Sequence, residues 1–241
     1  KLHSELMVRN YITDIQKSID LTEIFTEKDI ISNYNEEKIT SIGLVESDSV
    51  SAAFNADGKV CILNFASYKH PGGMFLNGSC AQEECLCHES TLYNVLKEQT
   101  DYYEYNNKNL NKALYTNRTL YSPEVLFEHN GQTKYIDVLT CAAPNYTAAA
   151  KYCKVTKQEN SDVLRKRIRF VLSIIKRKNI DTAILGAYGC GVFGQDPTEV
   201  ATIFIEEINN LFAYNCNTKF IFAIIDKNSD NYKAFDKVFS K

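Results

Sequence analysis

The sequence has no stretch rich in Pro, Gly or Ser that could act as a linker, so its 241 residues indicate a single domain, 1–241. It also lacks a run of about 18 apolar residues, the shortest that usually spans a membrane, and we expect no membrane segment. Residues 1–7 are amphipathic and charged and do not follow the pattern of a signal peptide. These absences predict a soluble protein of the cytoplasm.

No charge of either sign predominates. The 27 Lys and Arg residues are balanced by 30 Asp and Glu residues, which leaves a net charge of −3 and argues against a broad nucleic-acid-binding surface. Eight cysteines are too few, in a chain of this length, for the dense disulfide framework of a small secreted domain. Two of them, Cys61 and Cys141, lie inside apolar runs, and we therefore expect reduced thiols.

Apolar segments of strand length alternate with segments of helical periodicity, which predicts a mostly parallel sheet with helices on both faces. The expected strands are 42–45, 60–65, 135–143, 182–185 and 220–225, and the expected helices are 3–20, 82–99, 163–177, 197–212 and 230–239. Residues 101–130 have the weakest pattern, and we expect helical pieces and loop there. We interpret six basic side chains as a solvent-exposed helix face rather than a polyanion-binding ridge: Arg165, Lys166, Arg167, Arg169, Lys176 and Arg177.

Two glycine-containing loops each follow directly on an apolar strand. Segment 60–65 runs into Gly72 and Gly73, and segment 182–185 runs into the loop 186–194. Glycines let backbone N–H groups approach an anion closely, and ligands of parallel sheets bind beyond the carboxyl ends of the strands. We therefore expect both loops to line one site for a phosphate-bearing ligand.

A polar triplet, Gln82-Glu83-Glu84, opens the helix expected after the first loop. A carboxylate beside a bound diphosphate holds its proton more tightly, which suits a proton donor and acceptor better than a binding group. The two glutamates could instead be the acidic residues that helix N-termini favour.

Cysteine offers two other kinds of site. Cys80, Cys85, Cys87 and His88 lie within nine residues, but a helix places positions 85 and 87 on different faces, which disfavours zinc. Cys190 could be a nucleophile, although none of the four histidines stands in a context that pairs it with that loop. We expect no metal site.

These residues together resemble the signature of microbial-type poly(ADP-ribose) glycohydrolases, a branch of the macrodomain superfamily. The matching stretches are 64–67 (Asn-Phe-Ala-Ser), 71–74 (Pro-Gly-Gly-Met), 77–78 (Asn-Gly), 81–84 (Ala-Gln-Glu-Glu), 86–87 (Leu-Cys), 142–145 (Ala-Ala-Pro-Asn), 189–193 (Gly-Cys-Gly-Val-Phe) and 196–197 (Asp-Pro). The resemblance implies a three-layer α/β/α macrodomain-like fold with a mixed, mostly parallel sheet. Its core would be 42–240, preceded by an N-terminal helical extension, 1–40.

The resemblance also implies hydrolysis of the ribose–ribose O-glycosidic bond of poly(ADP-ribose), with release of ADP-ribose and no cofactor. Glu84 would be the catalytic acid and base, Glu83 would hold the hydroxyls of the adjacent ribose, and Gln82 would support them. The partners implied are ADP-ribose or its polymer, including polymer attached to a protein, and the protein would be a monomer. Two alternatives stay open: a hydrolase of single ADP-ribose groups on a protein or nucleic-acid acceptor, and an ADP-ribose-binding macrodomain with weakened catalysis.

The binding residues follow from the same resemblance. Gly72, Gly73 and the amide of Met74 would line the diphosphate from one side, and Gly189, Cys190, Gly191 and Val192 would line it from the other. Phe193 would pack against the terminal ribose and orient it. By a looser correspondence, Ser67 stands where many macrodomains place a ribose-binding Asn, and Asp48 stands where they place the acid that reads adenine.

Met74 departs from the family pattern, which has a third glycine at this position. If the position requires a positive φ, methionine costs about 1 kcal/mol or more there. Its side chain would also crowd the substrate. We expect the change to weaken cleavage of the polymer more than binding of ADP-ribose, because the backbone amides are retained.

Overall fold

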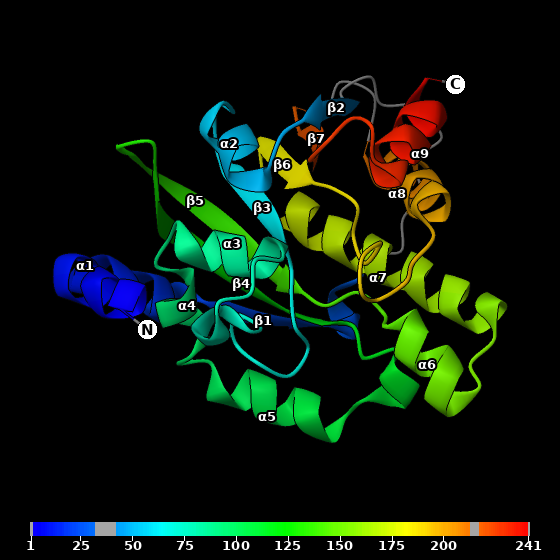
Figure 1. The fold of residues 1–241 in the computed structure, drawn as a ribbon, viewed down its shortest axis with the longest axis horizontal. Coiled ribbons are helices and arrows are strands. Elements are labelled where there is room, and N and C mark those ends of the chain that lie inside the picture. Colours follow the sequence, from blue (N-terminus) through cyan, green and yellow to red (C-terminus); the bar gives the residue numbers. More distant parts are fainter. Residues whose placement is uncertain (1, 32–41, 213–216, 241) are drawn as a thin grey trace.

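The computed structural model describes residues 2–31, 42–212 and 217–240 (Figure 1). Within them, seven strands form one sheet in the order β1-β4-β5-β3-β6-β7-β2. The strands are β1 (Glu23–Thr26), β2 (Ile42–Glu46), β3 (Val60–Phe65), β4 (Arg118–His129), β5 (Gln132–Cys141), β6 (Thr182–Leu185) and β7 (Lys219–Ile224). The five strands from β5 to β2 run parallel, whereas β4 is antiparallel to β5 and β1 is antiparallel to β4.

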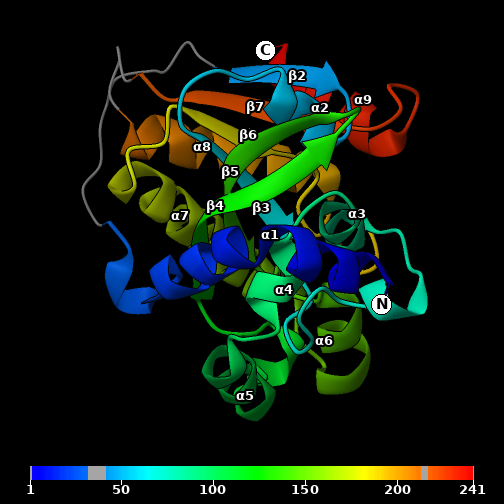
Figure 2. The ribbon, with the colours of Figure 1, turned by 90° about the vertical axis from the view of Figure 1, so that its left-hand side faces the viewer.

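Helices cover both faces of the sheet (Figures 1 and 2). On one face lie α1 (Leu2–Leu21), α2 (Ser49–Phe54), α3 (Gln82–His88) and α4 (Leu92–Leu96), and on the other lie α7 (Lys157–Arg177), α8 (Pro197–Leu211) and α9 (Asp230–Phe239). The remaining elements are α5 (Thr100–Lys108), α6 (Tyr146–Cys153) and the short 3-10 helices η1 (Glu27–Asp29), η2 (Phe75–Asn77) and η3 (Asn111–Ala113). The predicted three-layer α/β/α class with a mixed, mostly parallel sheet is confirmed.

Strand β3 illustrates why the sheet needs both layers. Successive side chains of a strand point to opposite faces. Val60 and Ile62 pack in the core formed with α2, α3 and α4, whereas Cys61 and Leu63 pack in the core formed with α7 and α8. A continuous apolar run is therefore buried on both sides, as the sequence predicted.

The long strand β4 was not predicted. The sequence interpretation placed helical pieces and loop over residues 101–130, but only α5 and η3 fit that description. The pairing of β4 with β5 shifts register between Ser122 and Val125, where Glu124 has a φ of 53°. This bulge, next to Pro123, interrupts the alternation by which a strand is recognised in a sequence.

The single helix predicted over 82–99 is two helices, α3 and α4. Between them Ser90 forms a bridge with Phe127 of β4, and the N–H of Glu128 donates to the carbonyl of Glu89 (2.8 Å). The contact with the unpredicted strand therefore ends the first helix.

The N-terminal extension predicted as helical also contributes to the sheet. Helix α1 packs against β4, as Figure 2 shows, and the following strand β1 pairs with β4 at the edge of the sheet. The predicted end of the extension, residue 40, lies outside the described residues, and the predicted start of the core, residue 42, is the first residue of β2.

The interpretation of the basic residues of α7 as a solvent-exposed face was wrong for two of them. Arg167 is 1% exposed, and its guanidinium donates to Asn117 Oδ1 (2.6 Å), to the Ala142 carbonyl and to the Leu114 carbonyl (3.3 Å). Arg169 is also buried and pairs with Glu207 (2.8 Å). Buried cations require such partners, and charge spacing alone does not reveal whether partners exist.

The seven cysteines in the described part of the chain are free thiols, in agreement with the prediction. Among the helices of the described residues, none has both the length and the apolar character needed to cross a membrane.

Candidate active site

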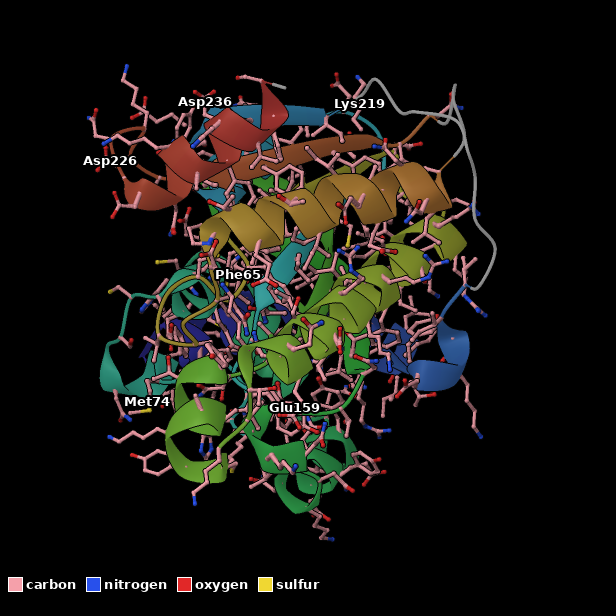
Figure 3. All side chains as sticks on the ribbon, turned by 90° about the vertical axis from the view of Figure 1, so that its right-hand side faces the viewer. Phe65, Met74, Glu159, Lys219, Asp226 and Asp236 are labelled. Atoms are coloured by element: carbon pink, nitrogen blue, oxygen red, sulfur yellow. The ribbon has the colours of Figure 1, made fainter. Side chains whose placement is uncertain are left out.

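A cleft of about 490 Å³ opens beyond the carboxyl ends of β3, β5 and β6. It brings together ten of the predicted site residues: Ser67, Gly73, Met74, Gln82, Glu83, Glu84, Gly189, Gly191, Val192 and Phe193. Phe65 lies at the end of β3 and Met74 on the loop that follows, both labelled in Figure 3. The two glycine loops thus line one site, as a parallel sheet dictates.

Glu83 is buried at the bottom of this cleft by contacts from β3 and the loop after it. Its Oε2 accepts the N–H of Ser67 (2.6 Å), and its Oε1 accepts Nδ2 of Asn64 (3.3 Å). The pKa of Glu83 is raised to about 8: burial is the main cause and neighbouring Glu84 adds to it, while the hydrogen bonds from Ser67 and Asn64 act to lower it. Glu83 is therefore predominantly neutral at pH 7.

The sequence interpretation did not assign Asn64 a contact with the site. Asn64 is fully buried in β3, and its amide also donates to Thr140 Oγ1 (3.3 Å). An amide side chain inside an otherwise apolar strand was the signal that could have identified it, because a buried polar group needs a partner.

The pKa of Glu83 predicts how stability depends on pH. Its ordinary value of 4.5 is raised to about 8, so between these values the folded protein keeps a proton that the unfolded chain has released. The stability that this proton provides is complete below pH 4.5 and is lost as the pH rises to 8, a change on the order of a few kcal/mol. In thermal unfolding measured from pH 5 to 9, the melting temperature of Glu83→Gln should rise relative to that of the wild type as the pH increases.

The exposed Glu104 supplies the control for this prediction. The melting temperature of Glu104→Gln should change with pH in the same way as that of the wild type. If the difference in melting temperature between Glu83→Gln and the wild type stayed constant from pH 5 to 9, the raised pKa of Glu83 would be contradicted.

Glu84 is held by one oxygen only. Its Oε1 accepts the N–H of Met74 (2.8 Å), while Oε2 is buried and has no hydrogen-bond partner among the described residues. A buried polar atom without a partner is costly, and one that belongs to a residue lining a cleft is a candidate contact for a bound ligand. Oε2 of Glu84 is thus available to a molecule bound in the cleft.

The first glycine loop lies directly against the carboxylates of Glu83 and Glu84. Gly73 has a φ of 58°, and a Cβ added there would lie 2.4 Å from Oε1 of Glu84 and 3.1 Å from Oε2 of Glu83. Its N–H donates to the carbonyl of His70 (3.1 Å), and the N–H of Met74 is bound to Glu84. Two of the amides predicted to line the diphosphate are therefore already engaged within the protein.

The second glycine loop offers donors that are not engaged. The N–H groups of Gly191, Val192 and Phe193 have no acceptor within the described ranges. Gly189, with a φ of 76°, makes the turn, since a Cβ there would lie 2.7 Å from Ala143. Three consecutive amides beside a cleft form the kind of concavity that binds phosphate oxygens.

The position of Met74 does not require a positive φ, so the condition under which methionine would be costly is not met. Its φ is −104°, which any residue adopts, and its side chain lines the cleft while remaining 53% exposed. The positive φ values of this loop belong to Gly72 and Gly73. Met74 therefore causes no backbone strain.

Met74→Gly should consequently change little. We expect turnover of the substrate within about threefold of the wild type and a loss of less than about 1 kcal/mol in unfolding free energy, because glycine only adds backbone freedom. Parallel kinetics and thermal unfolding test this. A large gain in turnover would show that the methionine side chain obstructs the substrate.

A second cavity of about 320 Å³ adjoins the first, and Phe65, Gln82 and Ala187 line both. Gln82 accepts the N–H of Phe65 (2.8 Å) and donates to the Leu63 carbonyl (2.9 Å), which fixes the start of α3 on the end of β3. These bonds hold the Gln82 side chain at the start of α3, directly before Glu83 and Glu84.

Asp48 lines this second cavity rather than the first. It caps α2 by accepting the N–H groups of Val50 and Ser51 (both 2.8 Å). Burial acts to raise its pKa, but the hydrogen bonds from Ser51 and Val50 outweigh this and hold the pKa below its ordinary value. Asp48 is thus an ionised acceptor at the far end of the combined cleft.

The cysteine alternatives receive no support from the geometry. Burial raises the pKa of Cys190 to about 12, so its thiol is protonated and a poor nucleophile. No group of three potential metal ligands occurs in the described part of the chain. Cys190 and Gly72 do not line the cleft, although Gly73, Gly189 and Gly191 beside them do.

Comparisons with known proteins complete the description of the site. A family model described as "Microbial-type PARG, catalytic domain", PARG being poly(ADP-ribose) glycohydrolase, matches residues 7–130, slightly more than half of the chain. A search of curated proteins found no match.

Solved structures match over nearly the whole chain. Poly(ADP-ribose) glycohydrolase from Thermomonospora curvata, bound to the inhibitor ADP-HPD, is 29% identical with a TM-score of 0.80, over 93% of this chain and 88% of that one. The enzyme from Deinococcus radiodurans in complex with ADP-ribose is 29% identical with a TM-score of 0.80, over 93% of this chain and 96% of that one.

Proposed function

The chain belongs to the family of microbial-type poly(ADP-ribose) glycohydrolase catalytic domains, and on that premise we propose that it hydrolyses the ribose–ribose O-glycosidic bond of poly(ADP-ribose) and releases ADP-ribose. The observation that carries the proposal is the buried Oε2 of Glu84, which has no partner among the described residues and lies in a cleft lined by both glycine loops. The similar enzymes with ADP-ribose or an inhibitor bound support the same ligand class.

Glu84 would act in both steps of the reaction. Its Oε2 would donate a proton to the 2′-oxygen of the leaving ribose as the glycosidic bond breaks through an oxocarbenium-like state. The resulting carboxylate would then take a proton from water as the water oxygen bonds to the anomeric carbon, which regenerates the acid. One carboxyl group serves both steps, unlike the separated pair of most glycosidases.

Glu83 would hold the hydroxyls of the ribose next to the bond. Burial raises its pKa to about 8, so the carboxyl of Glu83 stays neutral beside Glu84 when Glu84 becomes a carboxylate during the reaction. A neutral carboxyl can both donate and accept, which matches a pair of hydroxyls.

The rest of ADP-ribose would extend along the combined cleft. The amides of Gly191, Val192 and Phe193 would hold the diphosphate, and the second cavity would take the adenosine end with Asp48 as acceptor for the 6-amino group of adenine. Phe193 would pack against the terminal ribose.

The test measures, by chromatography, the ADP-ribose released from purified poly(ADP-ribose). The same assay is run on a panel of proteins and nucleic acids that carry single ADP-ribose groups. Release from the polymer supports the proposal. Release only from singly modified acceptors, or tight ADP-ribose binding in calorimetry with no product from any substrate, overturns it in favour of one of the two alternatives.

We also propose that the protein acts in the cytoplasm and as a monomer. Light scattering should give a mass near 27.4 kDa, and a value twice as large would refute the monomer. Fractionation of the source cells tests the compartment.

A further inference from the structure

The ring of Phe193 packs against two stacked tyrosines as well as against the main core. Tyr68 and Tyr115 are stacked with ring centroids 4.1 Å apart and planes at 12°, and Tyr115 meets Phe193 edge-on at 6.1 Å and 62°. Tyr68, Tyr115 and Ala142 form a small separate cluster against which Phe193 packs. Aromatic pairs in these arrangements add about 0.5–1.5 kcal/mol beyond the burial of their surface.

This cluster connects the two glycine loops. Tyr68 directly follows Ser67, whose N–H binds Glu83, and its hydroxyl is hydrogen-bonded to Thr116 Oγ1 (2.8 Å) and to the Asn109 carbonyl (2.9 Å). Phe193 belongs to the second loop, and its carbonyl accepts the N–H of Thr147 (3.2 Å). Tyr115 is the ring between them, and it does not line the cleft itself.

The backbone around Tyr115 is strained. Tyr115 has a φ of 65°, and the preceding Asn111, Lys112 and Ala113 also have positive φ values, although none is glycine. Each such residue costs about 1–2 kcal/mol. The segment is held by its surroundings: Asn111 Nδ2 donates to the Tyr115 carbonyl (3.0 Å), the Asn145 N–H donates to the Ala113 carbonyl (3.0 Å), and Arg167 donates to the Leu114 carbonyl (3.3 Å).

Strain that the surrounding structure maintains in this way is concentrated at functional sites. Here the strained segment carries Tyr115, whose ring contacts Phe193 but does not line the cleft. The buried Arg167 makes three hydrogen bonds around this segment and the end of β5. Support of this segment explains why a cation is buried here.

We propose that Tyr115 is a positioning residue for the hydrolysis: its ring, backed by Tyr68, holds the ring of Phe193 in the orientation that places the terminal ribose over Glu84. This inference rests on the proposed function. It assigns Tyr115 no contact with the substrate, and its effect passes through Phe193.

The experiment is a double-mutant cycle on polymer hydrolysis with Tyr115→Leu, Phe193→Leu and both together. Tyr115→Leu should lower kcat by about tenfold or more with KM within about threefold, because a misplaced reacting group affects the chemical step most. The double variant should be no slower than Phe193→Leu alone, since the two rings act as one unit. Tyr115→Phe keeps the ring and should retain most of the activity.

Phe212→Leu is the matched control, because Phe212 makes a comparable edge-on contact with Phe220 (4.8 Å) and lines neither of the two cavities. Additive losses in the cycle, a loss with Tyr115→Leu no greater than with Phe212→Leu, or a change confined to KM would each refute the positioning role. Absence of polymer turnover by the wild type would refute the proposed function and the positioning role with it, whereas turnover with additive losses refutes the positioning role alone.

Discussion

Replacing Glu84 by glutamine is expected to lower the release of ADP-ribose from the polymer by about 10²–10⁴-fold, the usual contribution of a general acid and base. The amide has nearly the same shape, and its oxygen can still accept the N–H of Met74 that now binds Oε1 (2.8 Å). It can neither donate a proton to the leaving oxygen nor take one from water. The loss should therefore appear in kcat, measured at saturating polymer, while calorimetry finds ADP-ribose binding nearly unchanged.

Glu98→Gln is the control for this variant, because Glu98 is an exposed carboxylate outside both cavities. It should keep wild-type kinetics. Full turnover by Glu84→Gln would show that another group carries the proton and would remove the main support of the proposed mechanism.

Gly73→Ala should cause the second largest loss of activity. The new methyl carbon would lie 2.4 Å from Oε1 of Glu84, so the catalytic carboxylate or the loop must move. Since a misplacement of about 1 Å can cost about 10²-fold in rate, we expect a fall in kcat of that order. The positive φ of 58° adds a loss of about 1–2 kcal/mol in unfolding free energy.

Gly78→Ala separates the loss of turnover from the loss of unfolding free energy. Gly78 also has a positive φ, 80°, but a Cβ added there meets nothing within 4 Å. It should therefore lose a similar amount of stability and keep its turnover. Equal turnover in the two alanine variants would mean that the contact between Gly73 and Glu84 does not matter for catalysis.

The results for the two loops show how far local patterns reach. The glycines, the strands before them and the Gln-Glu-Glu triplet were recognisable in the sequence, and the cleft does bring them together. The sequence did not reveal that Gly73 accommodates two carboxylates or that the N–H of Met74 binds Glu84. Both contacts depend on the distance between a loop and the helix after it.

Arg167 and β4 illustrate the same limit in the fold. A basic residue on an amphipathic helix is usually exposed, and only the approach of residues 114, 117 and 142 from three other segments makes burial of Arg167 possible. A bulge hides β4 from pattern recognition, although its pairing with β5 is extensive once the sheet forms.

By itself the sequence determined the layer architecture, the five parallel strands and the meeting of the two glycine loops at one cleft. These follow from periodicity and from the rule that parallel strands end at one edge, which depend on neighbours along the chain or on topology. Only the tertiary structure decided which carboxylate oxygen is left without a partner, which amides remain available, that Met74 is unstrained and that Tyr115 supports Phe193. Each of these depends on distances of a few ångströms between segments far apart in the sequence, and no local pattern encodes such distances.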